Sequence, residues 1–344
     1  MDAPESSGWP ELIPPEWIDR IRRCGERGID PTPLTRQCVL SPEELRPQPP
    51  AFTENPLEEQ TGTLLLKKYA GRALILTEAG CAMRCRFCFR RHTQTASPPS
   101  DNRSSSLYVT SHTSSLSGTL PSDPPAPSGP LGNTPRKHPG KPLSFVDRFH
   151  DAIRQIAADP GCHEVILSGG DPMTQPESLL AMEYRQLAGI PHVRRVRIHT
   201  RIPVIAPLHT PDPTLFRQMM PRLTTIVVLH VNHPLETDRR LGERPMRTIA
   251  ALVDAGLPVL CQTTLLRGVN DSADTLTELF ERLVDMRVIP YYLHQLDRVA
   301  GAAHFEVPVD QGRLIMEQLR NRLPGYAVPR YVREIPGEMY KKPL

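Results

Sequence analysis

Short apolar segments alternate with longer amphipathic segments between residues 72 and 322. In the longer segments the apolar residues recur at helical spacing, as Phe145, Phe149, Ile153 and Ile156 do. Strands are predicted at 73–79, 164–168, 193–199, 225–231, 258–266 and 288–296, and helices at 144–158, 176–188, 212–220, 237–255, 273–285 and 310–322. Strands that alternate with helices form a parallel sheet through right-handed crossovers. The pattern therefore predicts an α/β fold, an incomplete (β/α)6 barrel with functional loops at the carboxyl ends of its strands.

Three segments interrupt or flank this alternation. Residues 1–60 are rich in proline and charge, and they predict a covering arm with a short helix after Pro14-Pro15. Residues 97–142 contain eleven serines and ten prolines with almost no periodic apolar signal, which predicts a disordered insertion. The barrel core is therefore assigned to 61–96 and 143–322, and the C-terminal tail to 323–344.

The composition narrows the class of protein. The chain of 344 residues is 39% hydrophobic, which allows a sizeable core, and its net charge is +3. The segment 97–142 contributes +2 of this charge through four basic and two acidic residues, Arg103, Arg136, Lys137, Lys141, Asp101 and Asp123. The remaining positive charge is too small to attract nucleic acid.

Other features indicate where the protein works. No apolar run approaches the ~18 residues that a membrane span needs. The N-terminus is acidic and contains proline, unlike a secretory signal, and the seven cysteines are an odd number. These features predict a cytoplasmic protein without a membrane or nucleic-acid partner.

Cys81, Cys85 and Cys88 follow the first predicted strand in a C-x3-C-x2-C loop. Spacing this tight lets three sulfurs meet at one soft metal centre. Three thiolates would leave one iron of a [4Fe–4S] cluster open to a small-molecule ligand. The same cysteines with His92 would form a Cys3His zinc site, and buried or disulfide-bonded cysteines are a third interpretation. The spacing alone does not decide between iron–sulfur and zinc.

The position of this loop directly after a first barrel strand, with Phe87 before the last cysteine, resembles the radical S-adenosylmethionine (radical SAM) superfamily. Residues 85–92, Cys-Arg-Phe-Cys-Phe-Arg-Arg-His, resemble the lysine 2,3-aminomutase family, in particular its branch that makes β-lysine for modifying elongation factor P. The resemblance implies a [4Fe–4S] cluster on the three cysteines, S-adenosylmethionine (SAM) on the open iron, and pyridoxal 5′-phosphate (PLP). It also implies a radical SAM partial TIM barrel with an N-terminal helical arm and a C-terminal cofactor-binding tail.

Gly169, Gly170 and Asp171 end the second predicted strand. Glycines there let the backbone approach a ligand and an acid can hold an ammonium, although the same residues also form ordinary turns. By resemblance this motif holds the amino group of SAM, and His230, at the end of the fourth strand, faces the same ligand. Without the resemblance, His230 is interpreted as a core histidine.

Lys341 matches the lysine that carries PLP in the family, with Lys342 in the intervening position of the Lys-x-Pro pattern. Desolvation makes a lysine a good imine former, whereas two lysines near a C-terminus are ordinarily solvated. Residues 336–340 replace the glycine run that the family's free-lysine members carry before this lysine, as in the elongation-factor branch.

Four further residues complete the predicted cofactor pocket. By resemblance, Lys68, Tyr69 and Arg72 surround the phosphate and ring of PLP, and Gln262 lines the same pocket. Cations and a phenol suit the phosphate dianion. From the residues alone, Lys68 and Tyr69 would be interpreted as a solvated strand entrance.

Three charged residues decide the substrate prediction. By resemblance, Arg90 binds the substrate carboxylate through two parallel hydrogen bonds, and Asp297 and Glu334 bind a distal ammonium. Either acid would otherwise be interpreted as a surface residue. A cation at the far end of the substrate favours lysine over glutamate, and Glu334, where the free-lysine members have Asp, is typical of the elongation-factor branch.

The predicted function is that of an isomerase which converts L-α-lysine to β-lysine for attachment to elongation factor P by a separate ligase. By resemblance, an external donor such as flavodoxin supplies the electron that cleaves SAM. The resulting radical removes a hydrogen from Cβ of the PLP-bound lysine, and SAM is regenerated after the amino group has moved. The oligomeric state is left open, a homo-oligomer included.

Three other functions remain open at this point. One is an aminomutase that acts on free lysine, arginine or glutamate. Another is a zinc-stabilised RNA-binding module in which Arg84, Arg86, Arg90 and Arg91 contact phosphates. The last is a catalytically inactive barrel that serves as a scaffold.

Overall fold

The computed structural model describes residues 9–53, 64–78, 80–91, 144–219 and 222–344. The predicted insertion at 97–142 and the candidate zinc ligand His92 lie outside these residues. In the described part of the chain, no helix is long and apolar enough to cross a membrane.

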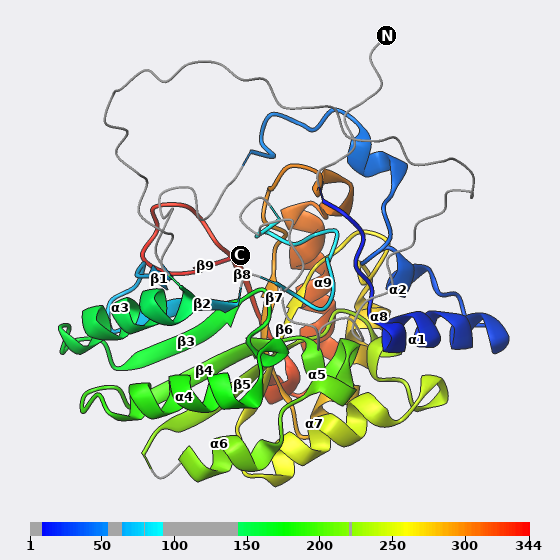
Figure 1. Ribbon diagram of the computed structural model, residues 1–344. Helices are drawn as coiled ribbons and strands as arrows, with labels where there is room; N and C mark the ends of the chain where they lie inside the picture. Colours follow the sequence, from blue (N-terminus) through cyan, green and yellow to red (C-terminus); the bar gives the residue numbers. More distant parts are fainter. Residues whose placement is uncertain (1–8, 54–63, 79, 92–143, 220–221) are drawn as a thin grey trace, which may run out of the picture.

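The described strands form one nine-stranded sheet in which spatial order follows sequence order. They are β1 (Leu65–Leu66), β2 (Arg72–Glu78), β3 (Glu164–Gly169), β4 (Arg195–Thr200), β5 (Thr224–His230), β6 (Val259–Thr264), β7 (Ile289–His294), β8 (Arg330–Arg333) and β9 (Lys342–Pro343). Strands β2 to β8 run parallel, and β1 and β9 pair antiparallel at the two edges (Figure 1).

This arrangement confirms the predicted parallel α/β barrel, and it adds one strand. Strands β2 to β7 correspond to the six predicted strands, whereas β8 lies in the segment assigned to the tail. A four-residue strand, Arg-Tyr-Val-Arg, is too short for its alternation to be recognised from the sequence. The seventh parallel strand brings the tail into the sheet.

The described helices are α1 (Pro15–Glu26), α2 (Thr32–Thr35), α3 (Phe145–Ala157), α4 (Glu177–Ala188), α5 (Ile202–Ile205), α6 (Pro213–Met219), α7 (Arg244–Asp254), α8 (Ala273–Asp285) and α9 (Val309–Arg322). Helices α3 to α9 lie between consecutive parallel strands, whereas α1 and α2 precede the sheet. Helices α3, α4, α6 and α7 line the outer side of the sheet (Figure 1). A capping box between Ser144 and Asp147 begins α3, and Ser272 caps α8.

The helix predicted at 237–255 is shorter than expected. Residues Pro234–Thr237 and Arg239–Leu241 form two separate 3-10 turns, and α7 begins only at Arg244. Gly242, with φ of 123°, lies between the turns and the helix, in a conformation that other residues rarely adopt. The chain therefore changes direction before α7.

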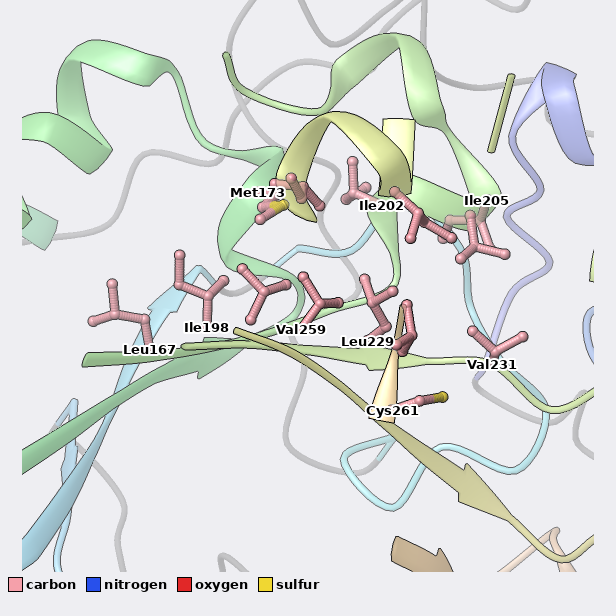
Figure 2. Close-up of a cluster of buried hydrophobic side chains, with 14 of the residues drawn as sticks. Leu167, Met173, Ile198, Ile202, Ile205, Leu229, Val231, Val259 and Cys261 are labelled. Carbon is pink, nitrogen blue, oxygen red and sulfur yellow. The ribbon is translucent and has the colours of Figure 1, made fainter. Parts of the chain in front are cut away.

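The pleat of the strands separates the apolar core from the polar interior of the barrel. Leu167, Ile198, Leu229 and Cys261 are buried on one face of β3 to β6, which packs against the helices (Figure 2). Fully burying a side chain of the leucine or isoleucine type contributes about 1.5–3 kcal/mol. Because successive side chains point to opposite faces, the next residue of each strand faces the interior of the barrel.

The N-terminal arm covers the cysteine loop. The backbone N–H groups of Arg84 and Arg86 donate to the carbonyls of Leu12 and Gln37 at 3.0 and 2.9 Å. A second apolar cluster lies at the same end of the barrel and consists of Phe52, Phe87, Leu266, Val269, Leu296, Val299, Ala302 and Phe305. Arm, cysteine loop and the loops after β6 and β7 thus share one buried contact region.

Candidate active site

The three cysteines of the loop after β2 carry free thiols. Burial, and then the neighbouring Cys85, raise the pKa of the Cys88 thiol to about 11. Burial also raises the pKa of Cys81 well above its usual range, with added repulsion from Asp171, Cys85 and Cys88. The three sulfurs therefore lie within electrostatic reach of one another, and a bound iron centre would relieve the repulsion between their thiolates.

Three cysteine thiols are the donor set that an iron–sulfur cluster takes. In the described ranges, no three or more Cys, His, Asp or Glu side chains are arranged to hold one metal ion. In a [4Fe–4S] cluster each cysteine binds a different iron through its thiolate. The donor set of Cys81, Cys85 and Cys88 therefore fits the cluster, while the zinc alternative depends on His92, outside the described residues.

Buried ion pairs fix the loop that carries the cysteines. Glu44, in the 3-10 helix η1 (Pro42–Leu45), accepts hydrogen bonds from Arg86 and Arg91. Arg86 also donates to the carbonyl of Trp9 at 3.0 Å, and the indole N–H of Trp9 donates to the carbonyl of Cys85 at 3.3 Å. Both arginines and the glutamate are buried, so the position of the loop depends on the arm.

The same burial bears on the RNA-binding alternative. Arg84, Arg86, Arg90 and Arg91 are all buried, and Arg84 lies 4.7 Å over the ring of Trp9. A phosphate backbone requires basic side chains that reach solvent. These four arginines hold the loop together and do not form a nucleic-acid surface.

The glycines after β3 support the cysteine loop from the other side. A Cβ atom on Gly170 would lie 1.4 Å from the carbonyl oxygen of Gly80, so only glycine fits. The backbone N–H of Asp171 donates to the same carbonyl at 3.2 Å. This close approach joins the cysteine loop to the end of β3.

The carboxyl group of Asp171 connects the ends of β3 and β4. It accepts hydrogen bonds from the backbone N–H groups of Met173 and Arg201 at 3.0 and 2.6 Å and from the hydroxyl of Thr200 at 2.8 Å. Burial raises its pKa to about 6, against the effect of these donors. Its predicted contact with SAM stays a prediction, and the structure places the motif beside the cysteines.

Arg90 links the cysteine loop to β3 and lies near Asp297, the acid that is predicted to bind the substrate ammonium. Its Nη1 donates to the hydroxyl of Ser168 at 2.8 Å and to the carbonyl of Gly169 at 2.6 Å. Burial lowers the pKa of the guanidinium, while attraction by Cys88, Cys81 and Asp297 opposes this shift. Arg90 and Asp297 therefore lie within electrostatic reach of each other at the barrel mouth.

His230 and Gln262 are register partners on β5 and β6 and belong to the interior face. The Nε2 atom of His230 lies 3.1 Å from the side-chain oxygen of Asn232, and its ring meets Phe87 edge-on at 5.7 Å. Burial, and then repulsion by Arg201, lower its pKa to about 3, so the imidazole is neutral at physiological pH. A neutral imidazole keeps a lone pair or an N–H available to a polar ligand.

The tail folds Lys341 back into the barrel mouth. Strand β9 pairs with β8, and the turn between them contains Gly337 with φ of 80°. As a result the Nζ of Lys341 lies 2.5 Å from the carboxylate of Glu334, whereas Lys342 is exposed on β9. Of the two adjacent lysines, Lys341 is the one that points toward the other predicted site residues.

Glu334 also binds two groups from the loop before β2. It accepts hydrogen bonds from the Nζ of Lys68 and from the hydroxyl of Tyr69, the latter at 2.7 and 3.0 Å. Burial acts to raise the pKa of Glu334, but Lys341, Lys68 and Tyr69 outweigh it and hold the pKa at about 2. The carboxylate is thus ionised and surrounded by donors.

Arg72 completes this group and fits a phosphate. Its guanidinium lies 4.2 Å over the ring of Tyr69, and among the described residues its buried Nε has no hydrogen-bond partner. Together with Lys68 and Lys341 it concentrates positive charge at one place, which suits a phosphate ester. The residues present therefore fit PLP.

Two further histidines that face the interior of the barrel are not among the site residues predicted from the sequence. His199 on β4 and His294 on β7 each follow a core residue, as His230 does, so they also face the interior. Burial lowers the pKa of both, and positive neighbours such as Arg197 and Lys341 lower it further. A polar residue near the carboxyl end of a strand, directly after a buried apolar one, is the signal that could have revealed them.

Comparisons with known proteins agree with this geometry. The model of the radical SAM superfamily matches residues 75–280. The chain is 36% identical to L-lysine 2,3-aminomutase of Escherichia coli over 334 residues, covering 96% of this chain and 82% of that protein. It is 33% identical to the enzyme of that name from Haemophilus influenzae over 332 residues, 96% and 82% of the two chains, and 32% identical to that of Clostridium subterminale over 323 residues, 92% and 66%.

Fold, cysteine loop and family model together define a radical SAM enzyme, which implies a [4Fe–4S] cluster and SAM. Within that class, the chain belongs to the lysine 2,3-aminomutase family, as the resemblance of residues 85–92 predicts. It is therefore an isomerase.

Proposed function

We propose that this enzyme converts L-lysine to β-lysine with PLP bound at Lys341. The relatives named L-lysine 2,3-aminomutase support the substrate. The observation that carries the proposal is the contact between Glu334 and Lys341 at 2.5 Å, because it places an acid that binds an alkylammonium group beside the predicted PLP lysine. With PLP held at Lys341, this side chain would no longer be available to Glu334, and the terminal ammonium of lysine could take its place on the carboxylate.

Each cofactor has its own group of residues in this proposal. Cys81, Cys85 and Cys88 hold the cluster. The SAM pocket is assigned to Gly169, Gly170, Asp171 and His230, and the PLP pocket to Lys341, Lys68, Tyr69, Arg72 and Gln262. When bound, the cluster and SAM supply a carbon radical, and PLP supplies the conjugated system that lets an amino group migrate.

The chain's own residues determine which amino acid reacts. Arg90 holds the carboxylate, and Asp297 and Glu334 hold the distal ammonium, so a substrate needs an acid at one end and a cation at the other. Glutamate would place a carboxylate against Glu334, whose pKa is held at about 2 by its neighbours, and two ionised acids repel each other. Phe87 is buried and meets the half-buried His230 edge-on, so this side of the site would be shielded from water.

The destination of the product follows from the same acid. Glu334 stands where free-lysine members have Asp, which supports the branch that modifies elongation factor P. We therefore propose that a separate ligase consumes the β-lysine, that a low-potential donor such as flavodoxin reduces the cluster, and that the reaction takes place in the cytoplasm.

Anaerobic turnover tests the proposal. Reconstituted protein with SAM, PLP and a reductant is given lysine or glutamate, and the products are identified by mass spectrometry. Formation of β-lysine supports the proposal, whereas conversion of glutamate but not lysine contradicts the substrate. Borohydride reduction followed by peptide mapping locates bound PLP, with Lys342→Ala as the matched control for Lys341→Ala.

A further inference from the structure

Arg201, directly after β4, makes a contact that the proposed reaction leaves unexplained. Its Nη1 donates a hydrogen bond to the sulfur of Cys85 at 2.9 Å. The side chain is buried, with 5% exposed. A guanidinium therefore lies against one of the three sulfurs that would bind the cluster, out of contact with bulk water.

Several groups fix the orientation of this guanidinium. Its Nη2 donates to the side-chain oxygen of Gln37 and to a carboxylate oxygen of Glu236, the latter at 3.2 Å. The planar group lies over the rings of Trp17 and Phe87, at 5.2 and 5.7 Å from their centroids. These contacts leave Arg201 little freedom to turn away from the sulfur.

Gln37 of the N-terminal arm has the central place in this arrangement. Its amide oxygen also accepts a hydrogen bond from the side chain of Asn232 at 3.0 Å, and its amide nitrogen donates to Glu236 at 3.0 Å. Its carbonyl accepts the backbone N–H of Arg86, next to Cys85, at 2.9 Å. One residue of the arm thus holds both the arginine and the loop that carries the sulfur.

We propose that Arg201 raises the reduction potential of the cluster through Cys85, and that Gln37 positions Arg201 for this purpose. Reduction adds one electron to the cluster, with no bond made or broken in the protein. A positive charge and an N–H···S hydrogen bond stabilise the more negative, reduced form. Glu236 reduces the effect of the charge but not of the hydrogen bond, because it lies on the other amino group of the guanidinium. The proposal rests on the superfamily's cluster alone and not on the choice of substrate.

Redox titration of anaerobically reconstituted, full-length protein tests this role. Dithionite serves as the reductant, and the electron paramagnetic resonance signal of the reduced cluster is the readout, without SAM or lysine. Arg201→Gln removes the charge and the hydrogen-bonding fork, Arg201→Lys keeps the charge, and Gln37→Ala keeps Arg201 but loosens it. Arg20→Gln is the matched control, because Arg20 is another buried arginine between arm and barrel that bonds the carbonyls of Leu235 and Gly242 and not the cysteine loop.

At the wild-type midpoint potential we expect the ratio of reduced to oxidised cluster to fall about tenfold in Arg201→Gln, which corresponds to about 59 mV for one electron. Arg201→Lys and Gln37→Ala should shift the midpoint in the same direction by less, and Arg20→Gln should leave it unchanged. An unchanged midpoint in Arg201→Gln with full iron and sulfide content would overturn the proposal.

The remaining outcomes also decide. If Arg201→Gln does not retain a cluster, the midpoint potentials of Arg201→Lys and Gln37→Ala decide instead. Wild-type midpoint potentials in both of these variants would overturn the proposal. Loss of the cluster from all three variants, with Arg20→Gln intact, shows a structural role and overturns it as well. An equal shift in Arg20→Gln has the same consequence, because any buried arginine would then produce it.

Discussion

The two ends of the candidate site are held by contacts of different kinds. At the cysteine loop, the side chains of Arg86 and Glu44 are 1% and 0% exposed. At the tail, those of Lys341 and Glu334 are 30% and 23% exposed. Fully buried ion pairs are costly to break, whereas partly exposed ones exchange readily with water and other ions.

This difference suits what each end has to do. The cluster end needs three sulfurs at fixed positions, and the arm supplies Glu44, Trp9 and Gln37 to fix them. In the proposed function, the tail end has to release Lys341 from Glu334 when PLP binds and to accept the ammonium group of the substrate afterwards. The cluster end is therefore built for rigidity and the tail end for exchange of ions.

The largest effect is expected from Lys341→Ala. It should abolish PLP binding and bring β-lysine formation below detection, because Lys341 is the proposed site of the covalent link. Its thermal unfolding midpoint should stay close to that of wild type, since the lost ion pair is partly exposed. Bound PLP is measured by absorbance, and Lys342→Ala should bind PLP as the wild type does. If Lys342→Ala lost PLP and Lys341→Ala kept it, the link would be at Lys342 and the prediction would be wrong.

Glu44→Gln should have the largest effect on stability. Removing this carboxylate leaves Arg86 and Arg91 buried without their counter-ion, which is expected to destabilise the fold by about 3–5 kcal/mol. Denaturant unfolding of the reconstituted protein measures it, together with iron content. Glu278→Gln, which breaks a pair with Arg282 at an exposed carboxylate, serves as the control and should change stability by less than about 0.5 kcal/mol.

The contrast also explains what could be predicted from the sequence. The order of strands and helices, the cysteine spacing and the glycines after β3 depend on local pattern, and the fold prediction is confirmed. The pairing of Glu44 with Arg86 joins residues 42 positions apart, and that of Arg201 with Cys85 joins residues 116 apart. Local periodicity carries no information about such contacts.

The tail shows a second limit of sequence reasoning. Only the family resemblance predicts a role for Lys341, because two lysines near a C-terminus have no distinguishing pattern of their own. What selects Lys341 over Lys342 in the structure is the pairing of β8 with β9, which turns one side chain toward Glu334 and the other toward solvent. Neither strand is long enough to be recognised from its residues.

Acidification should lower the free energy of unfolding through His230, which lies at the cluster end of the site. The pKa of His230 is lowered in the fold from 6.5 to about 3, so the folded protein binds fewer protons than the unfolded chain between these values. The contribution of the neutral His230 to stability is therefore fully present above pH 6.5 and is lost as the pH falls toward 3. From about pH 7.5 to about pH 5.5, wild type should lose about 1.4 kcal/mol more than His230→Gln in denaturant unfolding. Equal losses would mean that other groups dominate the acid response.

Glu334→Gln should affect stability much less than Glu44→Gln does. Its ion pairs with Lys341 and Lys68 are partly exposed, so the unfolding free energy should change by less than about 1 kcal/mol. The same substitution should raise KM for lysine by roughly tenfold or more, because a charged hydrogen bond to the substrate contributes about 1.5–3 kcal/mol. Glu334→Asp should retain most of the affinity. Loss of the Glu44 carboxylate should therefore lower the stability of the fold, whereas loss of the Glu334 carboxylate should lower the affinity for the substrate. A loss of stability in Glu334→Gln equal to that in Glu44→Gln would show that the tail end is as rigidly built as the cluster end.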